Sequence, residues 1–195
     1  FWTQDEFQAF LECVADKPIS YYAFEVLYWT GIREGELLAL TPTDFNFEKK
    51  TLRINKSYQR LEGKDVITSP KTPKSNRNIV MPDFLAVEME DFISSLYEIK
   101  NDDRIFIISK SYLHHEMDRG AKLAGVKRIR IHGLRHSHIS LLINLGFSAL
   151  AIGERVGHEA VDITYHYAHL FPTVQTDMAA QLETEREALV NVRKE

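Results

Sequence analysis

Residues 51–82, TLRINKSYQRLEGKDVITSPKTPKSNRNIVMP, interrupt an otherwise helical sequence and decide the expected fold class. Apolar residues recur at Leu52 and Ile54, then at Val66 and Ile67, then at Ile79 and Met81, among polar or charged ones, which is typical of half-buried strands. Gly63 and a proline-rich stretch supply turns between these runs. The segment therefore predicts a small antiparallel sheet of about three strands.

On either side of this segment the apolar spacing is helical. Thr3 and Glu6 are spaced as a capping box, Ser111 and Ser148 are candidate caps, and glycines end several of the apolar runs. We expect helices at residues 4–15, 18–31, 32–40, 83–97, 111–125, 134–146 and 148–157. The predicted class is mainly α with a small three-stranded antiparallel sheet, an α+β architecture.

The pattern predicts one domain, residues 1–172, followed by a polar helical tail, residues 173–195. Met178, Leu182 and Leu189 form a thin apolar stripe along this tail. Because so narrow a stripe cannot hold a helix alone, we expect the tail to dock on its own domain or on a neighbouring protomer.

The composition is that of a globular protein, with 195 residues, 44% hydrophobic and 27% charged. No apolar run approaches the roughly 18 residues of a membrane span, and the chain starts without a basic-then-apolar leader. A single cysteine, Cys13, excludes an internal disulfide and a multi-cysteine zinc site. We expect a cytoplasmic protein with no membrane partner.

The formal net charge of −4 argues at first against a nucleic-acid partner, but the charges are unevenly distributed. Residues 1–48 carry nine acidic and two basic side chains, whereas residues 49–80 have a net charge of +7 and residues 118–138 of +5. Local potential steers a polyanion, although an ordinary solvated basic face explains the pattern equally well. The candidate DNA contacts are Lys74, Arg77, Lys127, Arg128 and Arg130.

Short motifs carry residues suited to phosphate chemistry. In HGLRHSHIS, His132 and Arg135 are three apart at a helix start, so both can face one anion. In TGIREGELLAL, Arg33 and Glu36 form either a surface ion pair or a unit in which Glu36 holds Arg33 for a phosphate. Lys71, in a turn between predicted strands, is either simply solvated or able to reach bound DNA.

The ordered segments TGIREGELLAL, SPKTPKSNRNIVMP, HGLRHSHIS and VGHEAVDITYHYAH together resemble the tyrosine recombinase family of phage and transposon integrases. The family pattern is an arginine after Thr-Gly, a lysine in a hairpin, His-x-x-Arg, Gly-His, and a tyrosine followed two residues later by a histidine. All of these occur in order between Thr3 and His169. The resemblance implies the family's catalytic-domain fold, a helical bundle with a three-stranded sheet that wraps one face of DNA.

The same resemblance assigns the phosphate-binding groups. It implies that Tyr167, which lies in a Tyr-x-His, is the nucleophile, whereas Tyr165 is expected to be a packing residue. Arg33 and Arg135 are expected to clamp the non-bridging phosphate oxygens, and His158 to donate a further hydrogen bond to them.

The proton transfers follow from the resemblance as well. His132 is the expected base for the tyrosine, Lys71 the expected acid for the leaving oxygen, and Glu36 the residue that orients the first arginine. A 3′-phosphotyrosyl link forms and a 5′-hydroxyl leaves, so the link stores the bond energy. We therefore expect no metal, no cofactor and no ATP.

The partners implied are a double-stranded DNA recombination site and further copies of the chain. Family members act as homotetramers on paired DNA sites, although a free fragment is also expected to be monomeric. The family's N-terminal core-binding and arm-binding domains are absent from this stretch, which resembles a fragment of a longer integrase. The expected setting is the cytoplasm of a bacterial cell, with a phage or mobile element encoding the protein.

Three alternatives remain open on the residues alone. A metal-dependent nuclease would bind its metal through histidines, and EDTA would then abolish cleavage. The histidines available are His132, His136, His138, His158, His166 and His169. A non-catalytic DNA-binding relative would form no covalent adduct with a nicked site. A type IB topoisomerase shares much of the chemistry, but the short linkers and single domain favour an integrase.

Overall fold

The structure, a computed structural model, describes residues 1–69, 75–158 and 160–167, together with residues 170, 179, 182–184 and 186. Lys71, Lys74 and His169 lie outside the described residues, as does most of the segment 173–195. The predictions made for these residues, including the docking of the tail, therefore stay predictions.

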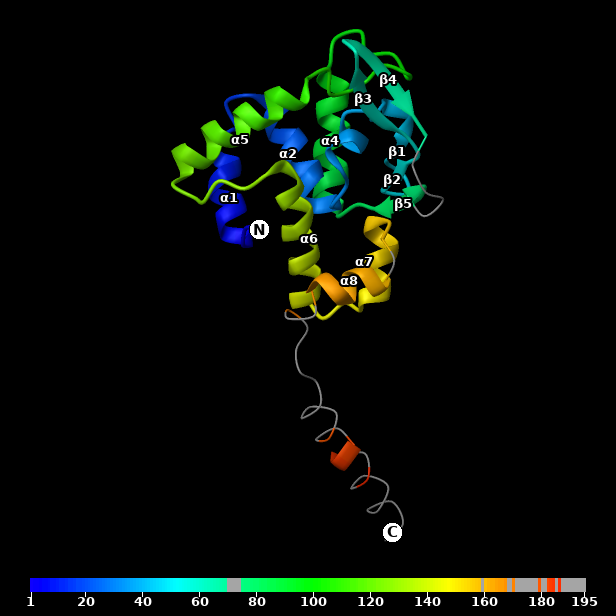
Figure 1. Ribbon diagram of the computed structural model, residues 1–195. Coiled ribbons are helices and arrows are strands. Elements are labelled where there is room, and N and C mark those ends of the chain that lie inside the picture. The colour runs from blue at the N-terminus through cyan, green and yellow to red at the C-terminus, as the bar shows by residue number, and fades with distance from the viewer. Residues whose placement is uncertain are drawn as a thin grey trace.

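The described part of the chain is mainly helical, as Figure 1 shows. The helices are α1 (Gln4–Glu12), α2 (Pro18–Thr30), α3 (Glu34–Leu37), the 3-10 helix η1 (Pro42–Asp44), α4 (Asp83–Ser95), α5 (Lys110–Ala124), α6 (Ile131–Asn144), α7 (Ala149–Val156) and α8 (Ala160–Tyr167). Within the described ranges, none of them is long and apolar enough to cross a membrane.

The helix ends follow from local capping chemistry. Thr3 and Glu6 form the predicted capping box at α1, and Ser148 caps α7 by accepting a hydrogen bond from the main-chain N–H of Ala151. The cap of α5 is Ser109 instead of the expected Ser111, because the Ser109 side chain accepts from the N–H three residues later. The apolar pattern thus predicted the helix, but not its first turn.

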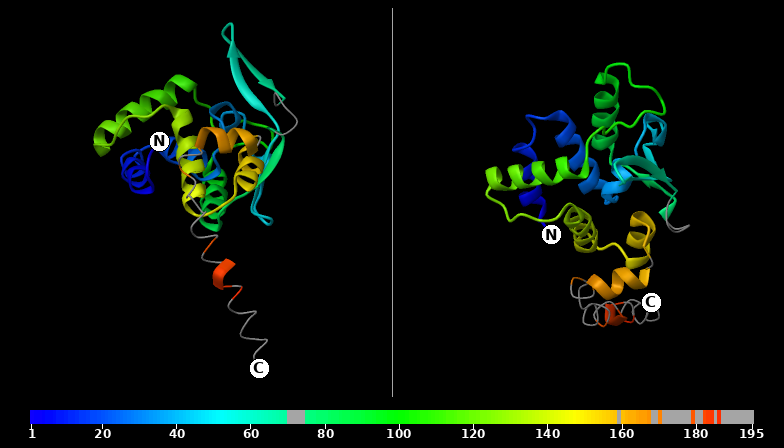
Figure 2. Two further views of the ribbon diagram at one scale, coloured as in Figure 1. Left: turned by 60° about the horizontal axis from the view of Figure 1, so that its bottom comes forward. Right: turned by 45° about the horizontal axis from the view of Figure 1, so that its top comes forward.

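A three-stranded antiparallel sheet is present, in the order β1-β2-β5, and is formed by β1 (Phe45–Asn46), β2 (Thr51–Ile54) and β5 (Arg77–Val80). Two of its strands, β2 and β5, were predicted, whereas β1 was not. The third predicted strand, at Val66 and Ile67, is β4 (Lys64–Thr68), which pairs instead with β3 (Ser57–Leu61) in a separate ribbon that projects from the body in the left view of Figure 2. Its two-residue loop, Glu62 and Gly63, has positive φ angles of 48° and 78°, which suits a tight hairpin turn.

Two apolar clusters hold the helices together. The larger one joins the helices up to α6 with the three-stranded sheet. The smaller one lies where α6, α7 and α8 meet, and its buried members are Ile139, Ile143, Ile152, Val156, Ile163 and Tyr167. The end of α8 is therefore fixed against α6 by the packing of a tyrosine ring, and that packing positions the candidate nucleophile.

Candidate active site

The end of α2 is built around Gly31, the glycine of the Thr-Gly motif. Its φ of +65° is left-handed, and a Cβ added there would lie 2.5 Å from Cδ2 of His138. A larger residue would therefore be strained in its backbone and would also collide with α6. The carbonyl of Gly31 accepts a hydrogen bond of 2.6 Å from Nη1 of Arg135, so α2 and α6 are also joined through this arginine.

Arg135 joins two helix ends inside the protein. Its Nη2 donates to the carbonyl of Val156 at the end of α7, at 2.5 Å, and the residue is only 1% exposed. Helix C-termini carry partial negative charge, so a guanidinium is favourable there. Its Nε has no hydrogen-bond partner among the described residues. Burial, together with the charges of Arg33 and Arg77, lowers the pKa of Arg135 to about 9.

Arg155, like Arg135, joins separate elements through its guanidinium, and the sequence did not suggest this role. Its guanidinium donates to the carbonyls of Trp29 and Val80 and to Nε2 of His138, at 3.0, 2.9 and 3.0 Å. Burial, followed by the charges of Arg155 and Arg135, lowers the pKa of His138 to about 3. This histidine is therefore a neutral acceptor within the scaffold and not a ligand for an anion.

The ion pair expected between Arg33 and Glu36 is present, with Nη1 and Oε1 2.9 Å apart. Arg77, which we expected to face DNA, is 9% exposed and donates from both terminal nitrogens to the same carboxylate, at 3.2 and 3.0 Å. The burial of β5 alternates, and Arg77 shares its buried face with Ile79. Arg77 is two residues from the apolar Ile79, and this two-residue spacing was the sequence signal that predicts a buried position for the arginine.

His132 and His158 lie in the electrostatic field of the same arginines. Partial burial lowers the pKa of His132 to about 4, with further contributions from His136, Arg135 and Arg33. The pKa of His158 is likewise lowered to about 4, by partial burial, then by Arg135 and Arg33. The charges of Arg33 and Arg135 thus disfavour protonation of both His132 and His158, an effect that a bound anion would relieve.

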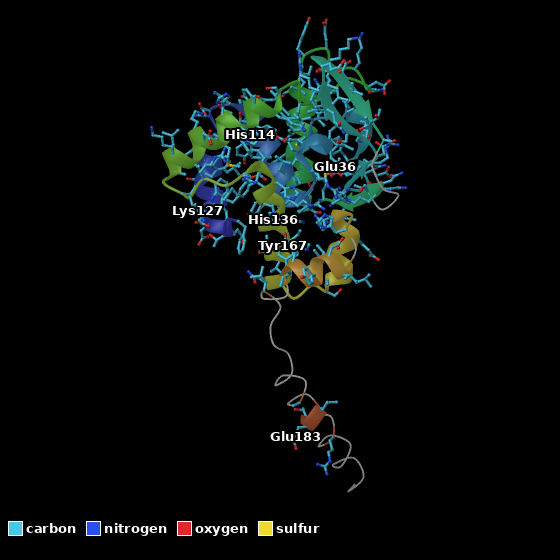
Figure 3. All side chains as sticks on the ribbon, viewed as in Figure 1. Glu36, His114, Lys127, His136, Tyr167 and Glu183 are labelled. Carbon is cyan, nitrogen blue, oxygen red and sulfur yellow. The ribbon has the colours of Figure 1, made fainter. Side chains whose placement is uncertain are left out.

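The two tyrosines of α8 differ sharply in environment. Tyr165 is 83% exposed, so the expectation that it packs is wrong, whereas Tyr167 is 7% exposed and its ring lies in the smaller apolar cluster. Burial raises the pKa of Tyr167, and the charge of Arg135 opposes that rise. The hydroxyl of Tyr167 contacts Nδ1 of His136, and Figure 3 shows the two residues side by side between α6 and α8.

This contact differs from the sequence-based assignment. The expected base was His132, one helical turn before His136, and the two imidazole rings lie 4.9 Å apart. Among the contacts of the described residues, the tyrosine hydroxyl meets His136 and not His132. The spacing of the two histidines, four residues apart on one helix face, was the available signal.

Three further residues that were predicted to contact DNA are not part of this cluster. Lys127, Arg128 and Arg130 are exposed on the segment that enters α6, and Arg128 pairs with Asp118 at 2.6 Å. They line the surface where we expected DNA contacts, but no contact in the structure tests that role. Over the described ranges, no group of three or more His, Cys, Asp or Glu side chains could hold a metal ion.

Comparison with protein families identifies the family to which the chain belongs. The model described as "Phage integrase family" matches residues 1–173. The chain belongs to the phage integrase family. Its predicted membership of the tyrosine recombinases, whose relatives include integrases and XerC-like recombinases, is thereby confirmed.

Individual members of the family agree with this assignment. The ICEBs1 integrase of Bacillus subtilis (strain 168) is 31% identical over 198 residues, covering 94% of this chain and 54% of the relative. The chain thus spans about half the length of the curated relatives it matches.

Solved structures of the family share the fold. A Tn1549 transposon integrase in complex with a circular intermediate DNA matches with a TM-score of 0.74 at 22% identity, covering 95% of this chain and 65% of that one. The catalytic domain of bacteriophage HP1 integrase matches with a TM-score of 0.63 at 20% identity, covering 93% of each chain. The predicted fold, mainly helical with small antiparallel sheets, is therefore confirmed.

Proposed function

We propose that residues 1–172 form the catalytic domain of a site-specific DNA recombinase, an integrase that cleaves and rejoins DNA through a 3′-phosphotyrosyl intermediate. One observation carries the proposal: the hydroxyl of Tyr167 lies beside an imidazole and within the field of Arg135. A phenol with a proton acceptor and fixed cations beside it is what nucleophilic phosphoryl transfer requires. Family membership supports the same conclusion, as does the match to an isolated integrase catalytic domain.

In the proposed reaction the Tyr167 oxygen attacks a backbone phosphorus. The new O–P bond forms as the bond to the 5′-oxygen breaks, and the phenol proton passes to a neighbouring imidazole. Arg33, Arg135 and His158 meet the negative charge that develops on the non-bridging oxygens. Removing one such donor costs about 100-fold to 1,000-fold in rate in other enzymes.

Arg135 can serve both the fold and the phosphate. Its hydrogen bonds to the carbonyls of Gly31 and Val156 use two of the five N–H groups of a guanidinium. The others, Nε–H among them, remain for an anion. Lys71 would protonate the leaving 5′-oxygen, a role carried only by the family pattern. The reverse step needs just the 5′-hydroxyl of another strand, so the proposed chemistry exchanges strands without metal, cofactor or ATP.

The proposed partners are double-stranded DNA and further copies of the protein. The Tn1549 integrase structure, which holds a circular intermediate DNA, supports DNA as the substrate. Assembly as a homotetramer on paired sites is the family's arrangement and is proposed here with it. Integration and excision of a mobile element within the bacterial cytoplasm is the corresponding role.

A nicked-duplex trap tests the proposal. A pool of nicked duplexes with random sequence around the nick is incubated with the chain at low salt, where sequence-independent affinity is highest. We expect a covalent protein–DNA adduct with the wild-type chain and with Tyr165→Phe, but none with Tyr167→Phe, in the presence of EDTA. An adduct that survives Tyr167→Phe, or the absence of any wild-type adduct, contradicts the proposal.

A further inference from the structure

The guanidinium of Arg155 joins the last turn of α7 to three other elements (Figure 1). It donates to the carbonyl of Trp29 in α2, to the carbonyl of Val80 in β5 and to Nε2 of His138 in α6, at 3.0, 2.9 and 3.0 Å. All three acceptors are neutral, and burial, followed by the charge of Arg77, lowers the pKa of Arg155. A guanidinium with neutral acceptors gains directional hydrogen bonds instead of a counter-charge, so it fixes the distances between these elements.

The main chain of the same turn accepts hydrogen bonds from two further arginines. Nε of Arg77 donates to the carbonyl of Arg155 at 2.9 Å, and Arg135 donates to the next carbonyl along the chain. Arg77 also holds Glu36, the carboxylate that binds Arg33. The last turn of α7 is therefore connected to both arginines of the proposed phosphate site, directly to one and through a shared carboxylate to the other.

The position of His158 follows from that of the turn. Gly157 ends α7 in the left-handed conformation, with a φ of +72°. The main-chain N–H groups of Gly157 and His158 both donate to the carbonyl of Gly153, at 2.8 and 2.9 Å, so His158 is fixed to the end of the helix. Because α7 is only eight residues long, its orientation depends on its contacts with neighbouring elements.

His138, the side-chain acceptor of Arg155, lies where three helices meet. A Cβ added at Gly31 would lie 2.5 Å from Cδ2 of His138 and 3.3 Å from Cγ1 of Val156, so α2, α6 and α7 are in direct contact there. Gly31 precedes Arg33 by two residues. The pair of His138 and Arg155 therefore packs against α2 at the point where the chain leads to the first proposed phosphate ligand.

We propose that Arg155 is a positioning residue for strand cleavage and that His138 is the acceptor that orients it. This inference rests on the proposed recombinase function. Arg155 touches no reacting atom. Its hydrogen bonds set the last turn of α7 against α2, α6 and β5, and this arrangement places His158, Arg135 and Arg33 around one phosphate. Lysine cannot take its place, because a single ammonium lacks the rigid fork of donors that reaches three elements at once.

The first test measures the environment of His158 in the DNA-free protein. Burial, followed by the two proposed phosphate-binding arginines, lowers the pKa of His158 to about 4. In Arg155→Lys we expect this pKa to rise by about 1 or more, because the ring moves out of that environment. The pKa of His132, which lies on α6, should stay near 4. Proton NMR titration of both rings, at a temperature where the variant is fully folded, measures the two values.

The second test measures single-turnover adduct formation on the nicked-duplex pool. Arg155→Lys should slow it about 10-fold to 100-fold, the usual effect of losing a supporting group. Affinity for duplex DNA at low salt should not change, because lysine keeps the charge. Val14→Ala, which opens a cavity in the larger apolar cluster, is the matched control for stability. It should lower the urea midpoint while leaving the cleavage rate and the His158 titration unchanged.

Substitutions of His138 test the pair without removing the arginine. In His138→Gln an amide oxygen can replace Nε2 as the acceptor, whereas His138→Phe fills the volume of the ring but accepts no hydrogen bond. We expect His138→Phe to slow adduct formation about 10-fold, and His138→Gln to restore most of that loss. Equal rates in the two variants would show that the acceptor does not orient Arg155, and they decide the question if Arg155→Lys does not fold.

The outcomes separate this inference from the proposed function. A wild-type cleavage rate in Arg155→Lys, with the adduct still on Tyr167, would overturn the inference and leave the recombinase proposal intact. An unchanged pKa of His158, or an equal loss of cleavage in Val14→Ala, would also overturn it, because Arg155 would then only stabilise the fold. Absence of any Tyr167 adduct in the wild-type chain would instead overturn the recombinase proposal, and with it the reaction that Arg155 is inferred to serve.

Discussion

Glu36 and Arg77 form a buried, two-point ion pair between α3 and β5. The two terminal guanidinium nitrogens of Arg77 donate to the two carboxylate oxygens at 3.2 and 3.0 Å, and both side chains are 6% exposed. The same carboxylate accepts from Nη1 of Arg33 at 2.9 Å. Burial alone would raise the pKa of Glu36, but the hydrogen bonds and charges of Arg77 and Arg33 outweigh it and lower that pKa. One carboxylate therefore fixes a candidate phosphate ligand to the sheet.

Glu36→Gln should weaken both the fold and the reaction. The amide keeps the size of the side chain but leaves two neighbouring guanidiniums without a counter-charge, and breaking a buried pair costs about 3 kcal/mol or more. We expect a loss of about 2–3 kcal/mol in the free energy of unfolding, measured with urea. Adduct formation should slow about 10-fold to 100-fold because Arg33 is no longer oriented.

Glu154→Gln, on the exposed side of α7, is the matched control. It should change the free energy of unfolding by less than about 0.5 kcal/mol and leave the cleavage rate unchanged. Equal behaviour of the two variants would show that the shared carboxylate does not position Arg33.

Arg135→Lys should lose the bridge between α2 and α7. A single ammonium cannot reach the carbonyls of both Gly31 and Val156, so one buried acceptor loses its partner, at a cost of about 1–3 kcal/mol. We expect a fall of about 2 kcal/mol in unfolding free energy and a loss of cleavage of about 100-fold or more. Arg60→Lys, at an exposed ion pair with Asp65, should change neither quantity. An Arg135→Lys variant with wild-type cleavage would rule out the guanidinium as a phosphate ligand.

Inorganic phosphate should raise the pKa of His132 and of His158. Both values are near 4 in the free protein, through burial and the nearby arginines, and a bound anion offsets that positive field. Proton NMR titration of the ring resonances, with and without phosphate, measures the change. Without phosphate, Arg33→Gln should raise both values and so reproduce part of the effect. Titration curves that do not respond to phosphate would contradict a shared anion site.

Glu25 should make the protein less stable as the pH rises. Burial, and then the charge of Glu88, raise the pKa of Glu25 from 4.5 to about 7, and the residue is 4% exposed. Between those values the folded chain holds a proton that the unfolded chain has released, so unfolding free energy falls with pH and levels off above about 7. The shift corresponds to about 3 kcal/mol.

Glu25→Gln removes this titration and should be more stable than the wild type at about pH 8, by about 2–3 kcal/mol, with little difference at about pH 4. Urea unfolding of both proteins at the two pH values measures the difference, in which the other titrating groups cancel. A difference independent of pH would mean that Glu25 is already ionised in the fold.

The sequence predicted elements whose signals are local. Gly31 ends α2 and Ser148 begins α7 because turn and cap chemistry is set by a few neighbouring residues. The alternation around Ile79 predicted a strand, and the same alternation would have buried Arg77 had it been applied to that residue. Charge alone had suggested DNA contact for Arg77, which was the wrong criterion for a strand residue.

What the sequence could not show depends on contacts between distant segments. His136 meets Tyr167 across 31 residues, and only the packing of α7 and α8 against α6 brings the two together. Arg77 meets Glu36 across 41 residues, through the pairing of β2 with β5. Family resemblance supplied an order of motifs, but the contact between His136 and Tyr167 could be seen only in the geometry.

Peptide mass spectrometry of the trapped protein–DNA adduct tests the central claim most directly. After nuclease and protease digestion, the account predicts a nucleotide attached through its 3′-phosphate to Tyr167, with the neighbouring Tyr165 unmodified. A nucleotide on Tyr165 or on any other residue, or attachment through a 5′-phosphate, would contradict it.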